Sequence, residues 1–286
     1  MFNKKEEKHI TDQDVKRTLP HNRQEVFFDL LRNRKMALFS LSCFTFIFFI
    51  PLAVDLFYFN FLESAAIAAD KQEYLFSLVF YSMLIMMPCM MIGFLGFAGA
   101  FYVAKKMVWQ EGTMLAMDFF KGIKENWKQA LVNGFIFAVI LFGAVIGGSY
   151  LIILSKAEPI WAGVGIGALI LVFLLFGMVT ALNFPQMVYY SNSFMATVKN
   201  SFCFIGLLHW KVFILFVLST GGVVALACFN FITLAIGLFL FAILNSVVII
   251  IYTLISHSAF DRFINQEHYP EMVGKGLYKV EDQKEA

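Results

Sequence analysis

The chain has 286 residues, of which 60% are hydrophobic and 15% are charged, and its mean hydropathy is +0.74. Soluble domains are roughly 45–50% apolar and about 25% charged. This composition excludes a soluble globular enzyme, a disordered chain and a disulfide scaffold, and the 35 Phe and 14 Met residues indicate a protein embedded in lipid. The net charge of +2 is too small to predict nucleic-acid binding.

A mostly polar arm, residues 1–35, precedes the first apolar run. We expect no cleavable signal peptide, because no small-residue cleavage site follows that run. Within the arm, Val26, Phe27, Leu30 and Leu31 form an apolar strip beside basic residues. This pattern predicts a basic helix on the inner face of the membrane.

The apolar runs that follow predict an all-α, polytopic membrane protein with six transmembrane helices. A helix needs roughly 20 apolar residues to cross a hydrocarbon core of about 30 Å. The last two helices come from one stretch, 212–256, which we divide at Asn230 because it is the most polar residue near the middle. The tail, 261–286, is polar. The predicted spans are 36–59, 74–104, 129–154, 160–183, 211–229 and 232–257.

The basic residues give these spans an orientation. Of the 22 Lys and Arg residues, only Lys71 and Lys156 fall on the side opposite the termini. Cytoplasmic loops carry an excess of Lys and Arg, so both termini are predicted to be cytoplasmic.

Two cytoplasmic connections have helical patterning of their own. In 113–128, apolar residues recur at helical spacing at Ala116, Phe120, Ile123 and Trp127. This stripe predicts a short amphipathic helix that lies in the headgroup plane before the third span begins.

A fainter copy of this pattern follows the fourth span. Phe194, Val198 and Phe202 share one helical face, and the segment ends in Trp210-Lys211, much as the first segment ends in a Trp-Lys pair. An internal duplication would explain the likeness. The preference of Trp and Lys for membrane interfaces would explain it equally.

The run 93–102 (GFLGFAGAFY), followed by 118–129 (DFFKGIKENWKQ), resembles the YesL-like family of bacterial integral membrane proteins. In that family a Gly/Ala-rich second span is followed by a charged segment of this type. The resemblance covers 36–260 and implies a small multi-span protein of the bacterial cell membrane, often encoded near carbohydrate ABC transporters and polysaccharide-degrading enzymes. The family has no assigned biochemical activity, so no catalytic or ligand-binding residue is transferred.

Three polar residues within the predicted spans are candidate ligand-binding groups. Asp55 could bind a cation or a sugar hydroxyl, or it could be a solvated carboxylate at the outer interface. Asn183 lies two residues before Pro185, where a broken helix would expose backbone carbonyls to a ligand. Asn183 and Asn245 could instead form hydrogen bonds between helices.

Small residues at a spacing of four predict close helix packing in the third and fourth spans. We expect these two spans to pack as an antiparallel pair through the glycines that face one another. These are Gly143, Gly147, Gly163 and Gly167.

The sequence contains no hydrolase, metalloprotease or nucleotide-binding motif, and its four cysteines lack metal-ligand spacing. We therefore expect no enzyme activity, no cofactor and no metal.

The charge-poor spans and the patterned cytoplasmic segments predict a non-enzymatic accessory or regulatory protein. The expected partner is an ABC transporter permease or another membrane protein, in association with carbohydrate uptake. A substrate-binding permease subunit or a small transporter without ion coupling is the alternative, and an enzyme of lipid or cell-wall metabolism is a third. The residues expected at the partner or membrane surface are Phe119, Phe120, Lys121, Lys124, Trp127, Lys128, Trp210 and Lys211.

Overall fold

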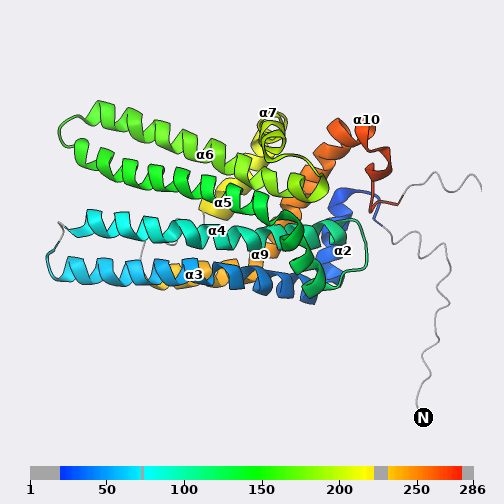
Figure 1. Cartoon of the computed structure of the whole chain (residues 1–286), viewed down its shortest axis with the longest axis horizontal. Helices are drawn as coiled ribbons and strands as arrows, with labels where there is room; N and C mark the ends of the chain where they lie inside the picture. Colours follow the sequence, from blue (N-terminus) through cyan, green and yellow to red (C-terminus); the bar gives the residue numbers. More distant parts are fainter. Residues whose placement is uncertain (1–19, 72–73, 222–230, 279–286) are drawn as a thin grey trace, which may run out of the picture.

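The computed structural model describes residues 20–71, 74–221 and 231–278 (Figure 1). Every regular element in these ranges is a helix, which confirms the predicted all-α class. The elements are α2 (Arg23–Asn33), α3 (Lys35–Ala68), α4 (Leu75–Val108), α5 (Leu115–Leu154), α6 (Pro159–Tyr189), α7 (Phe194–Phe216), η2 (Val217–Gly221), α9 (Phe231–Phe260), η3 (Asp261–Asn265), α10 (Gln266–His268) and η4 (Pro270–Met272).

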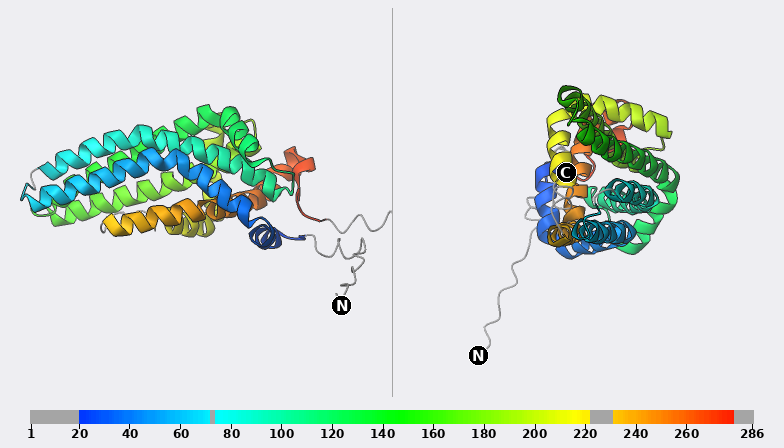
Figure 2. Two further views of the ribbon diagram at one scale, coloured as in Figure 1. Left: turned by 90° about the horizontal axis from the view of Figure 1, so that it is seen from below. Right: turned by 90° about the vertical axis from the view of Figure 1, so that its left-hand side faces the viewer.

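The long helices α3, α4, α5 and α6 lie side by side with alternating direction, and α9 packs along α3 and α4 (Figure 1). The terminal end of this bundle holds α2, the α4–α5 connection and residues 261–278; the loop end holds the connections that contain Lys71 and Lys156. Tyr278 N donates a hydrogen bond to Pro20 O at 2.9 Å, so both ends of the described chain lie together. At that end α2 runs across the axes of the long helices (Figure 2).

Local sequence explains where several helices begin. Asn22 caps α2, because its Oδ1 accepts a hydrogen bond from Glu25 N at 2.9 Å. Ser193 caps α7 in the same way, with Oγ 3.4 Å from Ala196 N. Pro159 begins α6, where the missing N–H costs no helical hydrogen bond.

Five helices are long and apolar enough to cross a membrane: α3, α4, α5, α6 and the continuous segment Phe231–His268. Each corresponds to one predicted span and extends beyond it. The third helix differs most from its predicted span, 129–154, because α5 begins at Leu115 and runs unbroken to Leu154. The prediction of a separate surface helix over 113–128 is therefore wrong. The polar turns at Lys121 and Lys124 favour helix as strongly as the apolar turns that follow, so nothing in the sequence ends the helix between them.

The segment predicted as the fifth span is only partly described. The helix bends by 104° between Phe194–Leu208 and Trp210–Thr220, and the first part of α7 is seen end-on in Figure 1. Residues 222–230, which include the predicted division at Asn230, lie outside the described residues.

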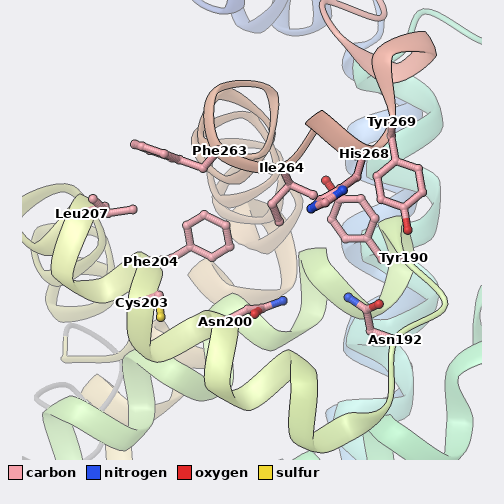
Figure 3. Close-up of a pocket in the computed structure, with 10 residues that line it drawn as sticks. All are labelled: Tyr190, Asn192, Asn200, Cys203, Phe204, Leu207, Phe263, Ile264, His268 and Tyr269. Carbon is pink, nitrogen blue, oxygen red and sulfur yellow. The ribbon is translucent and has the colours of Figure 1, made fainter. Parts of the chain in front are cut away.

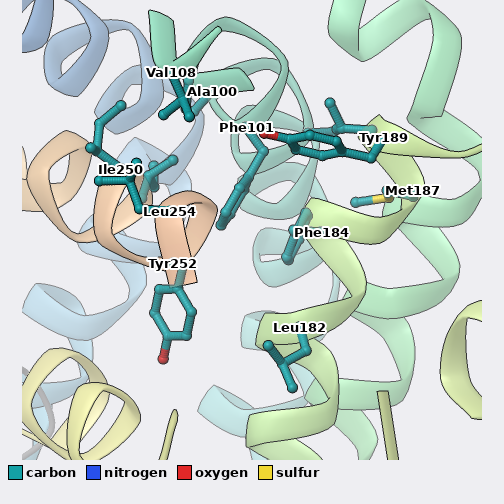
Figure 4. Close-up of a cluster of buried hydrophobic side chains, with 14 of the residues drawn as sticks. Ala100, Phe101, Val108, Leu182, Phe184, Met187, Tyr189, Ile250, Tyr252 and Leu254 are labelled. Atoms are coloured by element: carbon teal, nitrogen blue, oxygen red, sulfur yellow. The ribbon is translucent and has the colours of Figure 1, made fainter. Parts of the chain in front are cut away.

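Aromatic side chains fill the interior between the helices (Figure 4). Phe101 of α4 stacks on Phe184 of α6 with ring centroids 5.3 Å apart, and Phe94 contacts the same ring at 5.3 Å. Phe49 of α3 contacts Phe97 of α4 at 4.8 Å. This cluster joins α3, α4 and α6 in the half of the bundle nearer the terminal end.

Glycines on α4 and α5 allow the helices to approach this closely. A Cβ atom at Gly93 would lie 2.6 Å from Phe49 Cε1, and one at Gly99 would lie 2.8 Å from Phe119 O. At Gly122 a Cβ atom would collide with Tyr102 Cβ. These positions, and Gly177 of α6 against the Phe216 ring, are packed more tightly than the predicted ones.

The glycines predicted to join the third and fourth spans do not face one another. A Cβ atom at Gly143, Gly163 or Gly167 would meet no atom within 4 Å, and one at Gly147 would lie 3.1 Å from Leu169 Cδ1. Only Gly147 therefore lies against the neighbouring helix. The other three lie in open space, because α5 and α6 present different faces to each other in this region.

Candidate functional site

Asp55 lies between α3 and α4 and is only 7% exposed. Its Oδ2 accepts a hydrogen bond from Ser82 Oγ at 3.2 Å. The carboxylate is thus buried against a neighbouring helix, which disfavours the interpretation that water solvates it. Twenty residues separate Asp55 from Lys35 at the start of α3, which corresponds to about 30 Å of helix, the thickness of a hydrocarbon core.

Asn183 does not lie at a helix break. α6 continues through Pro185 to Tyr189, so the predicted opening of the helix is wrong. The proline removes one backbone donor, but side chains of neighbouring helices cover this turn, and a helix in such surroundings tolerates the loss.

The Asn183 side chain instead belongs to a buried chain of hydrogen bonds across α5, α6 and α7. Asn183 Nδ2 donates to Asn133 Oδ1 at 2.9 Å, and Asn183 Oδ1 accepts from Ser201 Oγ at 2.7 Å. Asn133 Nδ2 donates to Thr180 O, and Gln186 Nε2 donates to Ser201 Oγ. These contacts support the interhelical interpretation of Asn183 that the sequence left open.

Asn245 has the same kind of role between α9 and α3. Its Nδ2 lies 3.2 Å from Ser42 O and 2.9 Å from Phe241 O. Ser42 Oγ in turn donates to Ile243 O at 2.8 Å. Asn245 and Asn183 therefore lie in separate clusters, and the structure does not bring either of them together with Asp55.

The first turns of α5 present most of the predicted contact residues on an exposed surface. Phe120 is 55% exposed and Trp127 46% exposed, with Lys121, Lys124 and Lys128 beside them. We call these five residues the α5 face. Lys128 Nζ lies 5.6 Å from the Trp127 ring, and Lys121 Nζ lies 3.8 Å from Glu125 Oε1.

Phe119 is the exception to this prediction. It is fully buried, and its ring contacts Phe44 at 5.6 Å and Phe48 at 5.7 Å. It therefore joins α5 to α3 and is not available to a partner or to lipid. Phe119 and Phe120 are neighbours in sequence and point about 100° apart on the helix, and here Phe119 faces α3 while Phe120 faces outward.

Trp210 and Lys211 lie just after the bend of α7. Trp210 is 67% exposed, its ring centroid lies 6.3 Å from that of Phe213, and Lys211 is exposed. An exposed Trp-Lys pair where a helix turns toward apolar residues is typical of a membrane interface.

A buried polar cluster at the terminal end was not predicted. His257 is fully buried between two partners: Trp109 Nε1 donates to His257 Nε2 at 2.8 Å, and His257 Nδ1 lies 3.1 Å from Asp261 Oδ2. Nε2 must be unprotonated to accept this bond, so the imidazole is neutral with its proton on Nδ1. Arg23 Nη2 contacts the same Asp261 oxygen at 2.8 Å. We call Arg23, Trp109, His257 and Asp261 the terminal cluster.

Two lysines stack on the Trp109 ring. Lys105 Nζ lies 4.6 Å from its centroid and donates to Val188 O at 2.9 Å, and Lys275 Nζ lies 3.7 Å from the centroid and 2.9 Å from Glu111 Oε1. Both contacts place a cation over an indole face, which attracts it. The sequence offered little signal for the contacts of Lys275, because Trp109 and Glu111 lie far from it in the chain.

A pocket of about 650 Å³ opens beside this cluster, between α7 and the segment that follows α9 (Figure 3). The Tyr190 hydroxyl donates to Asn265 Oδ1 at 2.6 Å, and Asn265 Nδ2 donates to Asp261 Oδ1 at 2.8 Å, so the pocket wall is tied to the terminal cluster. Burial raises the pKa of the Tyr190 hydroxyl, which keeps it a neutral donor. The pocket is lined by Tyr190, Asn192, Asn200, Cys203, Phe204, Leu207, Phe263, Ile264, His268 and Tyr269.

Among the residues that the structure describes, no three His, Cys, Asp or Glu side chains come together in a group that could hold a metal ion. Comparison of the chain with protein-family models, with curated proteins and with solved structures finds no match.

Proposed function

We propose that this chain is a multi-pass protein of the bacterial cell membrane that serves as a non-enzymatic accessory or regulatory component of ABC-type carbohydrate uptake. The observation that carries the proposal is a contrast. The side-chain amides of Asn183 and Asn245 donate hydrogen bonds to groups on neighbouring helices, whereas the α5 face presents aromatic and basic side chains outward. Buried hydrogen bonds between helices hold the helices together, and an exposed aromatic and basic surface is free to bind a partner.

We further propose six crossings with both termini in the cytoplasm. Phe216, after the bend of α7, packs against Gly177, well inside the bundle, and Phe231 at the start of α9 lies 4.9 Å from Phe57. The described residues on either side of 222–230 thus support a further crossing, in which the chain after the bend of α7 runs from the terminal end toward the loop end. Residues 128 to 154 of α5 correspond to about 39 Å of helix. This length is close to that of a bilayer of about 40–45 Å including headgroups.

The resemblance of 93–102 and 118–129 to YesL-like proteins supports the link to carbohydrate transport. The α5 face forms part of that stretch. We therefore assign the contact with an ABC permease or its ATPase to this face, where the three lysines fit an acidic surface on the partner.

The test is crosslinking in the native host, followed by purification in mild detergent and mass spectrometry. Wild-type protein should recover an ABC permease or ATPase in stoichiometric amount. A variant with Lys121→Glu, Lys124→Glu and Lys128→Glu should lose it, whereas a control with Lys71→Glu and Lys156→Glu, which reverses exposed charges at the loop end, should keep it.

A second variant, Trp127→Ala, removes an aromatic contact without changing the charge balance that sets membrane orientation. It should weaken recovery of the transporter as well. Equal recovery with all variants would show that the α5 face is not the contact. Recovery of the chain alone would overturn the accessory role and favour direct assays of sugar binding and flux on reconstituted protein.

A further inference from the structure

The pocket between α7 and the C-terminal segment has a rigid, uncharged wall. Phe204 and Tyr190 both pack on the Phe260 ring with centroids 5.3 Å away, and the tilted Tyr190 and Tyr269 rings also have centroids 5.3 Å apart. None of the lining residues is Asp, Glu, Lys or Arg. Because the wall is already ordered by these contacts, a ligand would bind without the cost of organising it.

The polar groups of the pocket suit hydroxyl groups. Within the described part of the chain, the side-chain amides of Asn192 and Asn200 have no hydrogen-bond partner, and both line the pocket, as does His268 (Figure 3). An amide offers both a donor and an acceptor, which is what a hydroxyl group requires. A phosphate would instead call for a basic lining. Arg262 does not line the pocket, and its guanidinium carbon lies 5.3 Å from the centroid of the Phe263 ring.

The pocket is also apolar on one side, where it meets the bend of α7. Leu207 is 51% exposed and Phe263 44% exposed, and Figure 3 places both on the side away from Asn192 and Tyr269. Trp210, three residues beyond Leu207, marks the level of the membrane interface. A ligand with an apolar tail could therefore leave the pocket past Leu207 and Phe263 into lipid.

We infer that this pocket binds a membrane lipid with an uncharged, hydroxyl-bearing headgroup, such as a glycosyl diacylglycerol. The headgroup lies between Asn192, Asn200 and Tyr269, and the acyl chains pass Leu207 and Phe263. The inference does not depend on the proposed role of the α5 face, because that face lies on another helix.

The first experiment measures protection of Cys203, an exposed thiol on the pocket rim. The full-length protein is purified in a detergent without a sugar headgroup and placed in phosphatidylcholine nanodiscs that contain glucosyl diacylglycerol or phosphatidylglycerol at equal mole fraction. Alkylation by N-ethylmaleimide is followed by peptide mass spectrometry. At a lipid concentration well above Kd, glucosyl diacylglycerol should slow the reaction of Cys203 about tenfold or more, since protection scales with occupancy. It should not slow that of Cys43.

The second experiment uses the variant Asn200→Leu, with Lys199→Leu as the matched control on the exposed side of the same helix turn. The control should keep the protection and the variant should lose it, while both melt as wild type in lipid-free detergent. Equal protection by phosphatidylglycerol, or full protection in Asn200→Leu, would overturn the inference. Protection by free glucose alone would overturn the lipid assignment.

The Lys121, Lys124 and Lys128 charge-reversal variant separates the two proposals. It should keep the protection of Cys203 by glucosyl diacylglycerol even if it no longer recovers a transporter. Loss of protection in that variant would contradict the independence of the pocket from the α5 face.

Discussion

Glycines serve two different purposes in the two halves of this bundle. In the half toward the terminal end, Gly93, Gly99 and Gly122 lie against Phe49, Phe119 and Tyr102. In the α5–α6 pair toward the loop end, Gly143, Gly163 and Gly167 have open space where a side chain would be. The described part of α5 contains no buried residue beyond Ala138, so its loop-end half is less enclosed by neighbouring helices than its terminal half.

This difference shows that a small residue brings helices together only where a neighbour fills the space it leaves. Gly143 and Gly147 have the spacing that is typical of helix contacts in membranes. Gly99 and Gly122 belong to different helices, and no spacing within the sequence connects them. A neighbour that fills the space, and not the interval between glycines, distinguishes the packed positions: Gly165 lies against Leu151, although Gly163 and Gly167 on either side of it meet no atom.

The largest effect that we predict separates these two kinds of glycine. Gly122→Leu should lower the free energy of unfolding by about 3 kcal/mol or more, because even its Cβ collides with Tyr102 and overpacking a filled interior commonly costs about 1–3 kcal/mol. Gly143→Leu should change it by less than about 1 kcal/mol, since a leucine there meets open space and has the better helix propensity. Thermal or denaturant unfolding in mild detergent measures both. Equal losses in the two variants would mean that packing does not distinguish the two halves.

The sequence predicted the helices well because hydropathy is a local property. The helical class and the positions of five apolar helices followed from run lengths alone. Where the prediction failed, the missing information was orientation around the helix axis. On the first turns of α5, the buried positions are Asp118, Phe119, Gly122 and Asn126, whereas the apolar stripe through Phe120 and Trp127 is exposed. An amphipathic pattern shows which residues share a face of the helix, but it does not show which face meets the rest of the protein.

The polar clusters lay beyond the sequence for a different reason. Arg23 meets Asp261 across 238 positions, and Asn133 meets Asn183 across 50. A side-chain contact of this kind depends on which helices become neighbours and on where each residue lies along the bundle axis. Neither follows from composition or periodicity. The one detectable signal was an unusual polar residue within an apolar helix, which is how Asn183 and Asn245 were identified, though as ligand-binding candidates.

A smaller effect tests the terminal cluster as a source of stability. His257→Ala removes the acceptor of Trp109 Nε1 and leaves a cavity between α4 and α9. An unsatisfied buried donor costs about 1–3 kcal/mol and the cavity adds to this cost, so we expect a loss of about 3 kcal/mol. Hydrogen exchange of residues 269–278 should also become faster, because Asp261 anchors Gly274 N. The control, His268→Ala, removes an exposed ring and should leave both measurements unchanged. An unchanged exchange rate in His257→Ala would show that the segment is held by other contacts.

The smallest effect that we predict concerns Asp55, for which a structural role and a cation-binding role predict different results. Asn at this position still accepts a hydrogen bond from Ser82 Oγ and no longer buries a charge, so Asp55→Asn should change the free energy of unfolding by less than about 1 kcal/mol. If Asp55 only joins α3 to α4, the variant should also have the same melting temperature across a titration of Na⁺, K⁺ or Ca²⁺ as the wild type. A cation that stabilises the wild type and not Asp55→Asn would instead identify this carboxylate as a binding group, because a ligand raises the stability only of the form that binds it. The buried position of Asp55, with Ser82 as its hydrogen-bond donor, favours the first result.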